Sequence, residues 1–529
     1  MPSDCVSYQN SGYFSKLIID YLDEKDNLKP FYNRFPKLEN FDAQLLEKQK
    51  NFNHSIRKTL VSSLDVQYKT IKKSSLTQKN IANLALENTF TITTGHQLNL
   101  FTGPLYFLYK IISTIKLTQE LQTKHPSYNF VPIYWMATED HDFEEINYFN
   151  FKEKKIRWNQ ESKGAVGALS TAGLDKIFEV FEKELDAGAN SIWLKDLFKN
   201  AYSNHSNLSE ATRFLANELF GNHGLVILDA AVSDLKKSFI PYAKTELLEQ
   251  NSYSEVSNTI EKLDGYSIQV KPREINLFYL DSNLRERIIF ENNQYKINNT
   301  ALSFSKEEII VELENYPEKF SPNVIMRPLY QEVILPNLCY IGGGGELAYW
   351  LELKSYFDKS SVLFPMLLIR NSALLVSKKQ VGKIEKLNLS WHDLFQNQIE
   401  LLNNKVIGFA EFSLDFKPQK DNLKLQFEEL FRIAKKTAPS FIGAVKAQEA
   451  KQMKGLEHLE KRLLKAQKQK YKEELERITN LQNTLFPNQS LQERQLNFSE
   501  YYLEFGSEFI EKLFEELKPL EQEFKIVVL

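Results

Sequence analysis

Two stretches decide the fold: NTFTITTGHQLNLFTGPLYFLYK at residues 88–110 and FVPIYWMATEDHDFEEIN at residues 130–147. Each begins with β-branched and aromatic residues, which predict a buried strand, and each strand ends in polar side chains. In the first stretch a helical pattern follows Gly103 and Pro104, so it predicts strand, turn and helix. Together the stretches predict a parallel βαβ unit of an α/β protein. Such folds bind ligands in a crevice at the carboxyl ends of the strands.

The first predicted strand ends in Gly95, His96 and Gln97, and Lys110 lies in the helix that follows. A glycine at a strand-to-helix turn lets a phosphate approach backbone amides, and an imidazole can donate a hydrogen bond to negative charge. A histidine after a strand is also often a hydrogen-bonded turn residue without a catalytic role. The pattern leaves both interpretations open.

The second predicted strand ends in Glu139, Asp140, His141 and Asp142. Four adjacent polar groups are costly to bury unless they are paired or bind a ligand. Functional uses are Mg²⁺ binding by Asp140 or Asp142 and general-base catalysis by His141. The structural alternative is a helix N-terminus, with Thr138 as the cap and the acids facing the helix dipole.

A run of four glycines, residues 342–345, separates a predicted strand at 335–341 from a predicted helix at 346–357. Gly343 and Gly345 permit close approach of a phosphate or carboxylate to the backbone, and Glu346 follows them. A flexible connection explains the glycines equally well. Arg327 lies at the edge of an apolar run, where a guanidinium holds a substrate carboxylate or pairs with a structural acid.

The 529 residues predict several domains. The expected segments are a lead-in with the first part of the core at 1–150, a first insertion at 151–220, the core again at 221–274, a second insertion at 275–320, the core at 321–374, a coiled-coil arm at 375–490, and a C-terminal return to the core at 491–529. In the arm, leucines recur at helical spacing on both sides of residues 437–439, which predicts a helical hairpin that also packs on another chain.

Composition excludes several classes of protein. A net charge of −3 gives no support for a nucleic-acid partner, and two cysteines, Cys5 and Cys339, cannot form a disulfide framework. The N-terminus lacks the features of a signal peptide, and no apolar run is long enough for a membrane span. A cytoplasmic protein that does not enter membranes is therefore expected.

Four blocks, taken in order, resemble the bacillithiol biosynthesis cysteine-adding family (BshC). They are TTGHQLNLFTGPLYFLYKIIS, VPIYWMATEDHDFEEIN, MRPLYQE…LPNLCYIGGGGELAYW and LFPNQSLQERQLNF, and they extend from about residue 88 to residue 498. The family's glycine block reads GGPGE, and Gly344 stands here in the proline position. This substitution loosens the loop but keeps Glu346.

The resemblance implies a Rossmann-like core similar to that of class I aminoacyl-tRNA synthetases, with two connective insertions and a coiled-coil arm that supports a homodimer. The implied reaction joins the carboxyl group of cysteine to the amine of glucosaminyl malate. ATP and Mg²⁺ are the implied cofactors, through a cysteinyl adenylate. No typical lysine loop of those synthetases is present, and Lys378 and Lys379 match it only loosely.

The resemblance also distributes roles over the candidate residues. Gly95 and His96 would steady the ATP phosphates, with Gln97, Gly103 and Lys110 near the same pocket. Asp140, His141 and Asp142, with Glu139, would form the opposite wall and orient the metal or the amine. Arg327, Gly343, Gly345 and Glu346 would hold polar substrate groups.

Two other classes stay open at this point. The first is a metal-dependent hydrolase with His96, Asp140, His141 and Asp142 as metal ligands, which would work without nucleotide. The second is a scaffold protein whose coiled-coil arm is the functional part.

Overall fold

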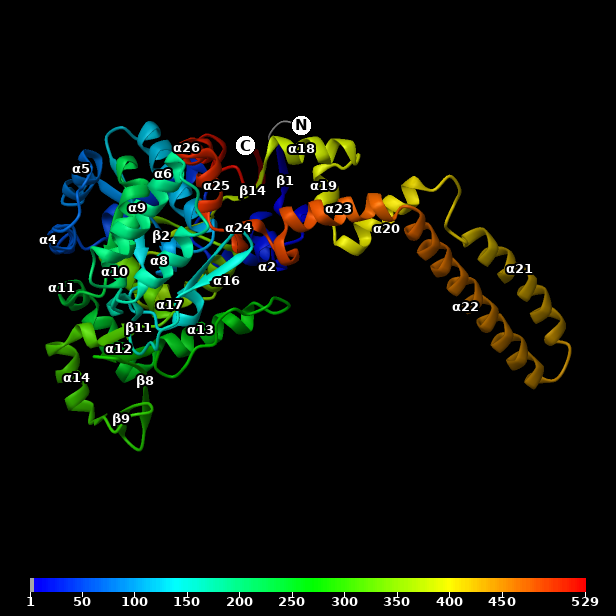
Figure 1. Cartoon of the computed structure of the whole chain (residues 1–529). Helices are drawn as coiled ribbons and strands as arrows, with labels where there is room; N and C mark the ends of the chain where they lie inside the picture. Colours follow the sequence, from blue (N-terminus) through cyan, green and yellow to red (C-terminus); the bar gives the residue numbers. More distant parts are fainter. Residues whose placement is uncertain (1–3) are drawn as a thin grey trace.

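A five-stranded parallel sheet forms the core of the computed structural model, which describes residues 4–529 (Figure 1). Its strands are β2 (Thr89–His96), β3 (Asn129–Met136), β6 (Val226–Asp229), β12 (Asn337–Gly342) and β13 (Met366–Ile369). They are ordered β13-β12-β2-β3-β6 across the sheet. The chain thus builds outward from β2 on one side and then crosses to β12 on the other, which is the doubly wound Rossmann order. The predicted α/β class is confirmed, and the switch point lies between β2 and β12.

The register of the strands brings the two polar clusters to one edge of the sheet. Every residue of β2 is buried, and its threonine hydroxyls bond to β12: Thr93 donates to Asn337 at 2.9 Å and Thr94 to the Ile341 carbonyl at 2.7 Å. On the other side of β2, His96 pairs with Met136 of β3. The residues after His96 and after Met136 therefore leave adjacent strands at the same level.

Helix α6 (Tyr106–Lys124) connects β2 to β3 and begins two residues later than Pro104, where the helical pattern was expected to start. The preceding turn is left-handed at Phe101, Thr102 and Gly103. A Cβ on Gly103 would lie 2.5 Å from the Cβ of Asn99, so this tight turn requires glycine. Phe101 anchors the turn in a cluster of aromatic rings that includes Phe498, 5.2 Å away.

The lead-in is helical apart from one strand. It consists of β1 (Asp4–Ser7), α1 (Tyr8–Ser11), α2 (Lys16–Leu22), α3 (Phe41–Asn51), α4 (Ile56–Gln67) and α5 (Ser75–Asn83). Helix α3 contacts β12, whereas α4 and α5 contact β6. These helices therefore complete the hydrophobic core around the parallel sheet.

Two segments interrupt the sheet. The first contains α7 (Phe143–Ile146), the hairpin of β4 (Tyr148–Phe151) and β5 (Lys154–Arg157), and helices α8 (Leu174–Glu182), α9 (Ala189–Ser203) and α10 (Leu208–Phe220). After β6 come α11 (Ser233–Lys236), α12 (Ile240–Glu249) and α13 (Asn251–Lys262). The second contains the antiparallel strands β7 (Leu277–Asp281), β8 (Leu284–Glu291), β9 (Gln294–Ile297) and β10 (Ser303–Phe304), helix α14 (Lys306–Asn315) and β11 (Phe320–Pro322).

The helix that follows the glycine run begins at Gly344, two residues earlier than the sequence predicted. Helix α15 (Met326–Ile334) precedes β12, and the expected helix at 346–357 is two helices, α16 (Gly344–Leu351) and α17 (Lys354–Lys359). Gly343 caps α16, so Gly344 and Gly345 form its first turn. The first N–H groups of this helix lack partners within it and face the switch point.

The C-terminal part projects from the body as a helical arm (Figure 1). It contains α18 (Lys378–Lys386), α19 (Trp391–Phe395), α20 (Gln398–Phe409), α21 (Lys417–Ala434), α22 (Pro439–Lys470) and α23 (Lys472–Leu485). Helices α21 and α22 pack together as a hairpin that turns at residues 435–438. The expected pair of helices on either side of residues 437–439 is therefore present.

The chain then returns to the body through α24 (Gln492–Gln495), α25 (Phe498–Phe505), α26 (Ser507–Glu516) and β15 (Glu523–Val528). Strand β15 does not join the central sheet: it lies between β1 and β14 (Ser372–Val376) in a separate sheet. None of the helices among residues 4–529 is both long and apolar enough to cross a membrane.

Candidate functional site

The switch point between β2 and β12 holds an ion pair that faces the crevice. Lys110 Nζ lies 2.5 Å from Glu346 Oε1 and donates to the Gly95 carbonyl at 2.7 Å. The Tyr340 hydroxyl donates to Glu346 Oε2 at 2.6 Å, and the Gly343 N–H donates to Oε1 at 3.0 Å. The fold therefore brings together four residues that the sequence had singled out in two distant stretches, Gly95 and Lys110 in one and Gly343 and Glu346 in the other.

Burial acts in opposite directions on this pair. It lowers the pKa of Lys110, although the Glu346 carboxylate counters the shift. Burial would raise the pKa of Glu346, but the charge of Lys110 and the hydrogen bonds from Lys110, Tyr340 and Gly343 outweigh it and hold that pKa below its usual value. Glu346 is thus ionised and keeps Lys110 charged beside Gly95.

Arg327 lies next to this pair without a carboxylate partner. It donates to Gln331 at 3.1 Å and to the Tyr349 hydroxyl at 3.4 Å, and its guanidinium lies 5.7 Å from the Tyr340 ring. Across the described residues, 4–529, no aspartate or glutamate comes within ion-pair distance of it. The basic side of the crevice therefore holds a guanidinium that no carboxylate of the described residues pairs with.

Arg370 supplies a second guanidinium at the start of α16. It is 4% exposed and pairs with the buried Glu493 at 2.7 Å, yet its Nε has no hydrogen-bond partner. That Nε lies 3.7 Å from where a Cβ on Gly343 would be. Glu493 lies 123 positions from Arg370 in the chain, so no local pattern of the sequence could reveal this arrangement.

His96 is buried between the rings of Tyr106 and Phe107, with 6% of its surface exposed. Its pKa is far below the usual value because burial, and next the charge of Lys110, oppose protonation. One ring nitrogen bonds to the Thr102 backbone, and the other, Nε2, is buried without a partner. Since the Thr102 bond places the proton on Nδ1, the neutral ring offers a lone pair at Nε2. The imidazole here is an acceptor, in contrast to the donor expected from the sequence.

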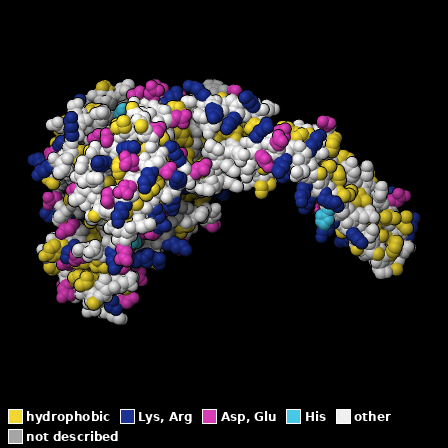
Figure 2. Space-filling model, in the orientation of Figure 1, with side chains coloured by type: hydrophobic (Ala, Val, Ile, Leu, Met, Phe, Trp, Pro, Cys, Tyr) yellow, Lys and Arg dark blue, Asp and Glu magenta, His cyan; other side chains and the backbone are white. Residues whose placement is uncertain are grey.

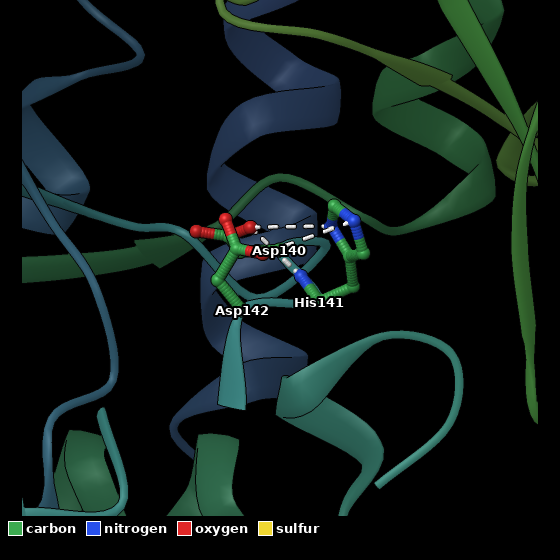
Figure 3. A group of neighbouring side chains, drawn as sticks. All are labelled: Asp140, His141 and Asp142. Carbon is green, nitrogen blue, oxygen red and sulfur yellow. Dashed lines mark hydrogen bonds and ion pairs between the residues drawn. The ribbon is translucent and has the colours of Figure 1, made fainter. Parts of the chain in front are cut away.

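The end of β3 forms the other, acidic side of the site (Figure 3). Gln97 joins the two sides, because its Nε2 donates to Asp140 Oδ2 at 3.0 Å and to Glu145 Oε2 at 2.9 Å. The His141 N–H donates to Asp140 Oδ1 at 2.7 Å. Burial would raise the pKa of Asp140, but the His141 ring nearby, these hydrogen bonds and the charge of Arg285 hold that pKa well below its usual value.

Asp140, His141 and Asp142 offer three potential metal-binding atoms within 4.8 Å of one another. However, Arg285 lies 2.6 Å from His141 Nδ1, and both oxygens of Asp140 accept hydrogen bonds. Arg285 thus engages the histidine nitrogen and other donors engage Asp140, so these three residues do not form a preformed magnesium site. His96 is not part of this group, so the four-ligand centre expected for a hydrolase is not formed.

One expected site residue, Glu139, and the expected helix cap, Thr138, have other structural contacts instead. Glu139 turns away from the crevice and pairs with buried Lys236 at 2.7 Å, although burial raises its pKa. Thr138 donates to Asp229 and does not cap a helix.

Gly103 shapes the turn before α6 and lines a cavity of about 410 Å³ together with Gln97 and Arg494, beside the crevice. Sequence reasoning did not single out Tyr340, Arg285 and Arg494. Tyr340 and Arg494 lie within the blocks that resemble the family, but no local spacing indicated a role for any of the three.

Comparison with known proteins agrees with this organisation. The model of "Bacillithiol biosynthesis BshC, N-terminal Rossmann-like domain" matches residues 1–371, and that of "Bacillithiol biosynthesis BshC, C-terminal coiled-coil domain" matches residues 373–529. A solved structure described as an arginyl-tRNA synthetase from Campylobacter jejuni covers 82% of this chain and 98% of its own at 11% identity. Its TM-score of 0.22 is too low to support any argument.

Curated relatives extend over the whole chain. A protein of Flavobacterium johnsoniae named "Putative cysteine ligase BshC" is 63% identical over 529 residues, which is 100% of both chains. Proteins with the same name from Flavobacterium psychrophilum and Bacillus cereus strain B4264 are 61% and 29% identical, and cover 100% and 94% of this chain and 99% and 95% of their own. The chain therefore belongs to the bacillithiol biosynthesis BshC family.

Proposed function

We propose that this protein is a cysteine ligase, which joins the carboxyl group of L-cysteine to the amine of glucosaminyl malate as an amide. The relatives carry the name of a cysteine ligase, and neither a hydrolase nor a scaffold is supported by any of them. The observation that carries the proposal is the opposite charge of the two sides of the crevice. Arg327 is unpaired on one side, and the carboxylates of Asp140 and Asp142 lie on the other.

This distribution of charge suits an amino acid, which is itself a zwitterion. On the basic side the pairs Lys110–Glu346 and Arg370–Glu493 are each neutral, so Arg327 adds one positive charge. The carboxylate of cysteine would neutralise that charge, and its ammonium group would face Asp140 and Asp142. Binding in this direction places the carboxyl group, where the amide forms, beside Gly95 and the start of α16.

A free carboxylate must be activated before it forms an amide, and ATP is the cofactor we assign to this step. The fit rests on unpartnered donors: Arg370 Nε and the first N–H groups of α16 lie where a phosphate could approach the backbone. Gly343 and Gly345 keep this approach open, whereas His96 Nε2 can accept a hydrogen bond from a hydroxyl or amine. The ATP would supply the activating group. Mg²⁺ remains an expectation to which no protein ligands are assigned.

We also assign to the protein a homodimer that forms through the arm. Leu425, Leu430 and Ile433 on α21 and Phe441 and Leu459 on α22 are between 43% and 63% exposed, and hydrophobic side chains are visible along the arm (Figure 2). A second copy of the arm would cover these side chains. The substrates in this proposal are small molecules, no nucleic acid is bound, and the reaction takes place in the cytoplasm.

The test is product formation by the purified protein. It is incubated with L-cysteine, glucosaminyl malate and ATP, and the amide product is identified by mass spectrometry. Release of AMP or of ADP then distinguishes adenylation from phosphorylation. The Arg327→Met variant should lose activity, and Arg287→Met, on the exposed face of β8, should not. Absence of product from the wild-type protein under all nucleotide conditions would refute the proposal.

A further inference from the structure

The second insertion delivers a charged side chain to the acidic side of the crevice. Strands β7 and β8 form a hairpin, and Arg285, near the start of β8, reaches back to the segment after β3. Its guanidinium Nη1 lies 2.6 Å from His141 Nδ1. No aspartate or glutamate within residues 4–529 lies within ion-pair distance of Arg285, although Glu139, Asp140 and Asp142 are close enough to raise its pKa against the lowering effect of burial.

This contact determines where the proton of His141 lies. A guanidinium only donates hydrogen bonds, so the ring nitrogen that it contacts must present a lone pair. The proton of the neutral ring is then on Nε2. The nearest acid to Nε2 is Asp142, whose Oδ1 is 3.8 Å away and can only accept. Asp142 therefore favours the same tautomer as Arg285. Asp140 Oδ1, 3.6 Å from Nδ1, favours the opposite one, but the contact of Nδ1 with Arg285 is shorter by 1.0 Å and decides between them.

The hairpin is fixed relative to the strand end by packing. The Arg285 guanidinium lies 4.0 Å from the centre of the Phe278 ring, which also lies 5.8 Å from the His141 ring. The first insertion supports it from the other side. Its Val166 N–H donates to the Asp140 carbonyl at 2.7 Å, and Gly164 is so close to the hairpin turn that a Cβ would lie 3.0 Å from the Leu284 nitrogen.

We propose that Arg285 is a positioning residue of the ligase: it holds His141 as the Nε2–H tautomer, so that the ring donates a hydrogen bond to a substrate oxygen. The proposal rests on the proposed function for the identity of the substrate, but the tautomer is independent of it. A ring held in this way is a donor and not a base, because its lone pair is engaged by a cation.

The tautomer can be measured directly. The protein is labelled with ¹⁵N-histidine, and long-range ¹H–¹⁵N spectra distinguish protonated from unprotonated ring nitrogens at neutral pH. His141→Gln identifies the His141 signals among those of the eight histidines. The wild-type protein should show the proton on Nε2. Arg285→Met should give a mixture of tautomers, whereas Arg285→Lys, which keeps a charged donor, should retain the single form.

Kinetics separate positioning from a general structural effect. Loss of a residue that orients a functional histidine typically costs on the order of 10- to 100-fold. We expect Arg285→Met to lower kcat by that factor with little change in KM for cysteine, Arg285→Lys to recover part of it, and Arg287→Met to behave as wild type. A wild-type proton on Nδ1 would overturn the proposal even without a folded variant, and so would unchanged kcat in Arg285→Met. Failure of the wild type to make product would refute the ligase assignment alone, because the spectra still decide the tautomer.

Discussion

The two sides of the crevice look alike in sequence but differ in physical character. Each is a short polar cluster after a buried strand, and each contains one histidine. In the fold, His96 lies in a buried, basic environment beside Lys110, whereas His141 is exposed among carboxylates. The difference comes from topology. The end of β2 lies at the switch point and is enclosed by β12 and α16, but the end of β3 is covered only by the two insertions.

The largest effect should follow from breaking the ion pair on the basic side. Lys110→Met leaves Glu346 partly buried without its partner, which we expect to cost about 3 kcal/mol of unfolding free energy. Activity should fall by on the order of 1000-fold, because the charge that holds Glu346 and the Gly95 carbonyl in place is lost. Urea unfolding and product formation measure the two effects.

The double variant Lys110→Met/Glu346→Met is the matched control. Replacing both partners by apolar side chains removes the uncompensated charge, so stability should return towards the wild-type value while activity stays low. Equal stability losses in the single and double variants would show that packing around Lys110, and not its pairing with Glu346, supports this side of the crevice.

Arg327 should affect catalysis without affecting stability. Arg327→Met removes a charge that has no acidic partner and keeps the apolar stem, so the unfolding free energy should change by less than about 1 kcal/mol. The kcat/KM for cysteine should fall about 100-fold, because a charge-assisted bond to the carboxylate is worth roughly 1.5–3 kcal/mol. A stability loss as large as that of Lys110→Met would contradict the assignment of Arg327 to substrate.

A third prediction concerns the support of α16. Glu352, at the end of this helix, accepts the N–H groups of Gln269 and Val270 at 2.7 and 3.3 Å, and burial raises its pKa to about 7. A raised pKa in the folded state stabilises the protein below the unfolded-state value, and this stabilisation is lost as the pH rises through about 7. Between pH 5 and pH 8 the wild type should therefore lose on the order of 2 kcal/mol of unfolding free energy relative to Glu352→Gln.

Urea unfolding of both proteins at several pH values measures this difference. Glu428→Gln, an exposed change on α21 of the arm, provides the control and should follow the wild-type curve. Parallel curves for the wild type and Glu352→Gln would mean that the Glu352 carboxyl is not protonated in the folded protein near neutral pH, and that the loop at 269–270 is held by other contacts.

The sequence was informative about the location of the site and much less so about its chemistry. Runs of β-branched and apolar residues that stop at polar or glycine residues located the ends of β2, β3 and β12, because strands buried on both faces of a parallel sheet form nearly continuous runs of this kind. That Lys110 meets Glu346 could not be read from spacing, since 236 positions separate them and only the crossing of the chain to β12 brings them together. The same holds for Arg285, which a different insertion supplies. From the local pattern, Glu139 and Asp140 were equivalent candidates for the site. In the fold, however, the Glu139 side chain pairs with Lys236.

The smallest expected effect is the difference in stability between alanine substitutions at Gly342 and at Gly343, two neighbouring glycines next to the start of α16. A Cβ on Gly342 would lie 2.9 Å from the Tyr340 ring and 3.0 Å from the Glu346 Cβ, whereas a Cβ on Gly343 would meet nothing closer than 3.5 Å. Gly342→Ala should therefore cost about 1–2 kcal/mol of unfolding free energy through overpacking. Gly343→Ala should cost less than about 1 kcal/mol.

If ATP phosphates approach the backbone here, Gly343→Ala should still raise KM for ATP, because its methyl group would point towards Arg370 Nε. An unchanged KM in that variant, measured beside Gly382→Ala on α18 as the control, would place the phosphates elsewhere on the basic side.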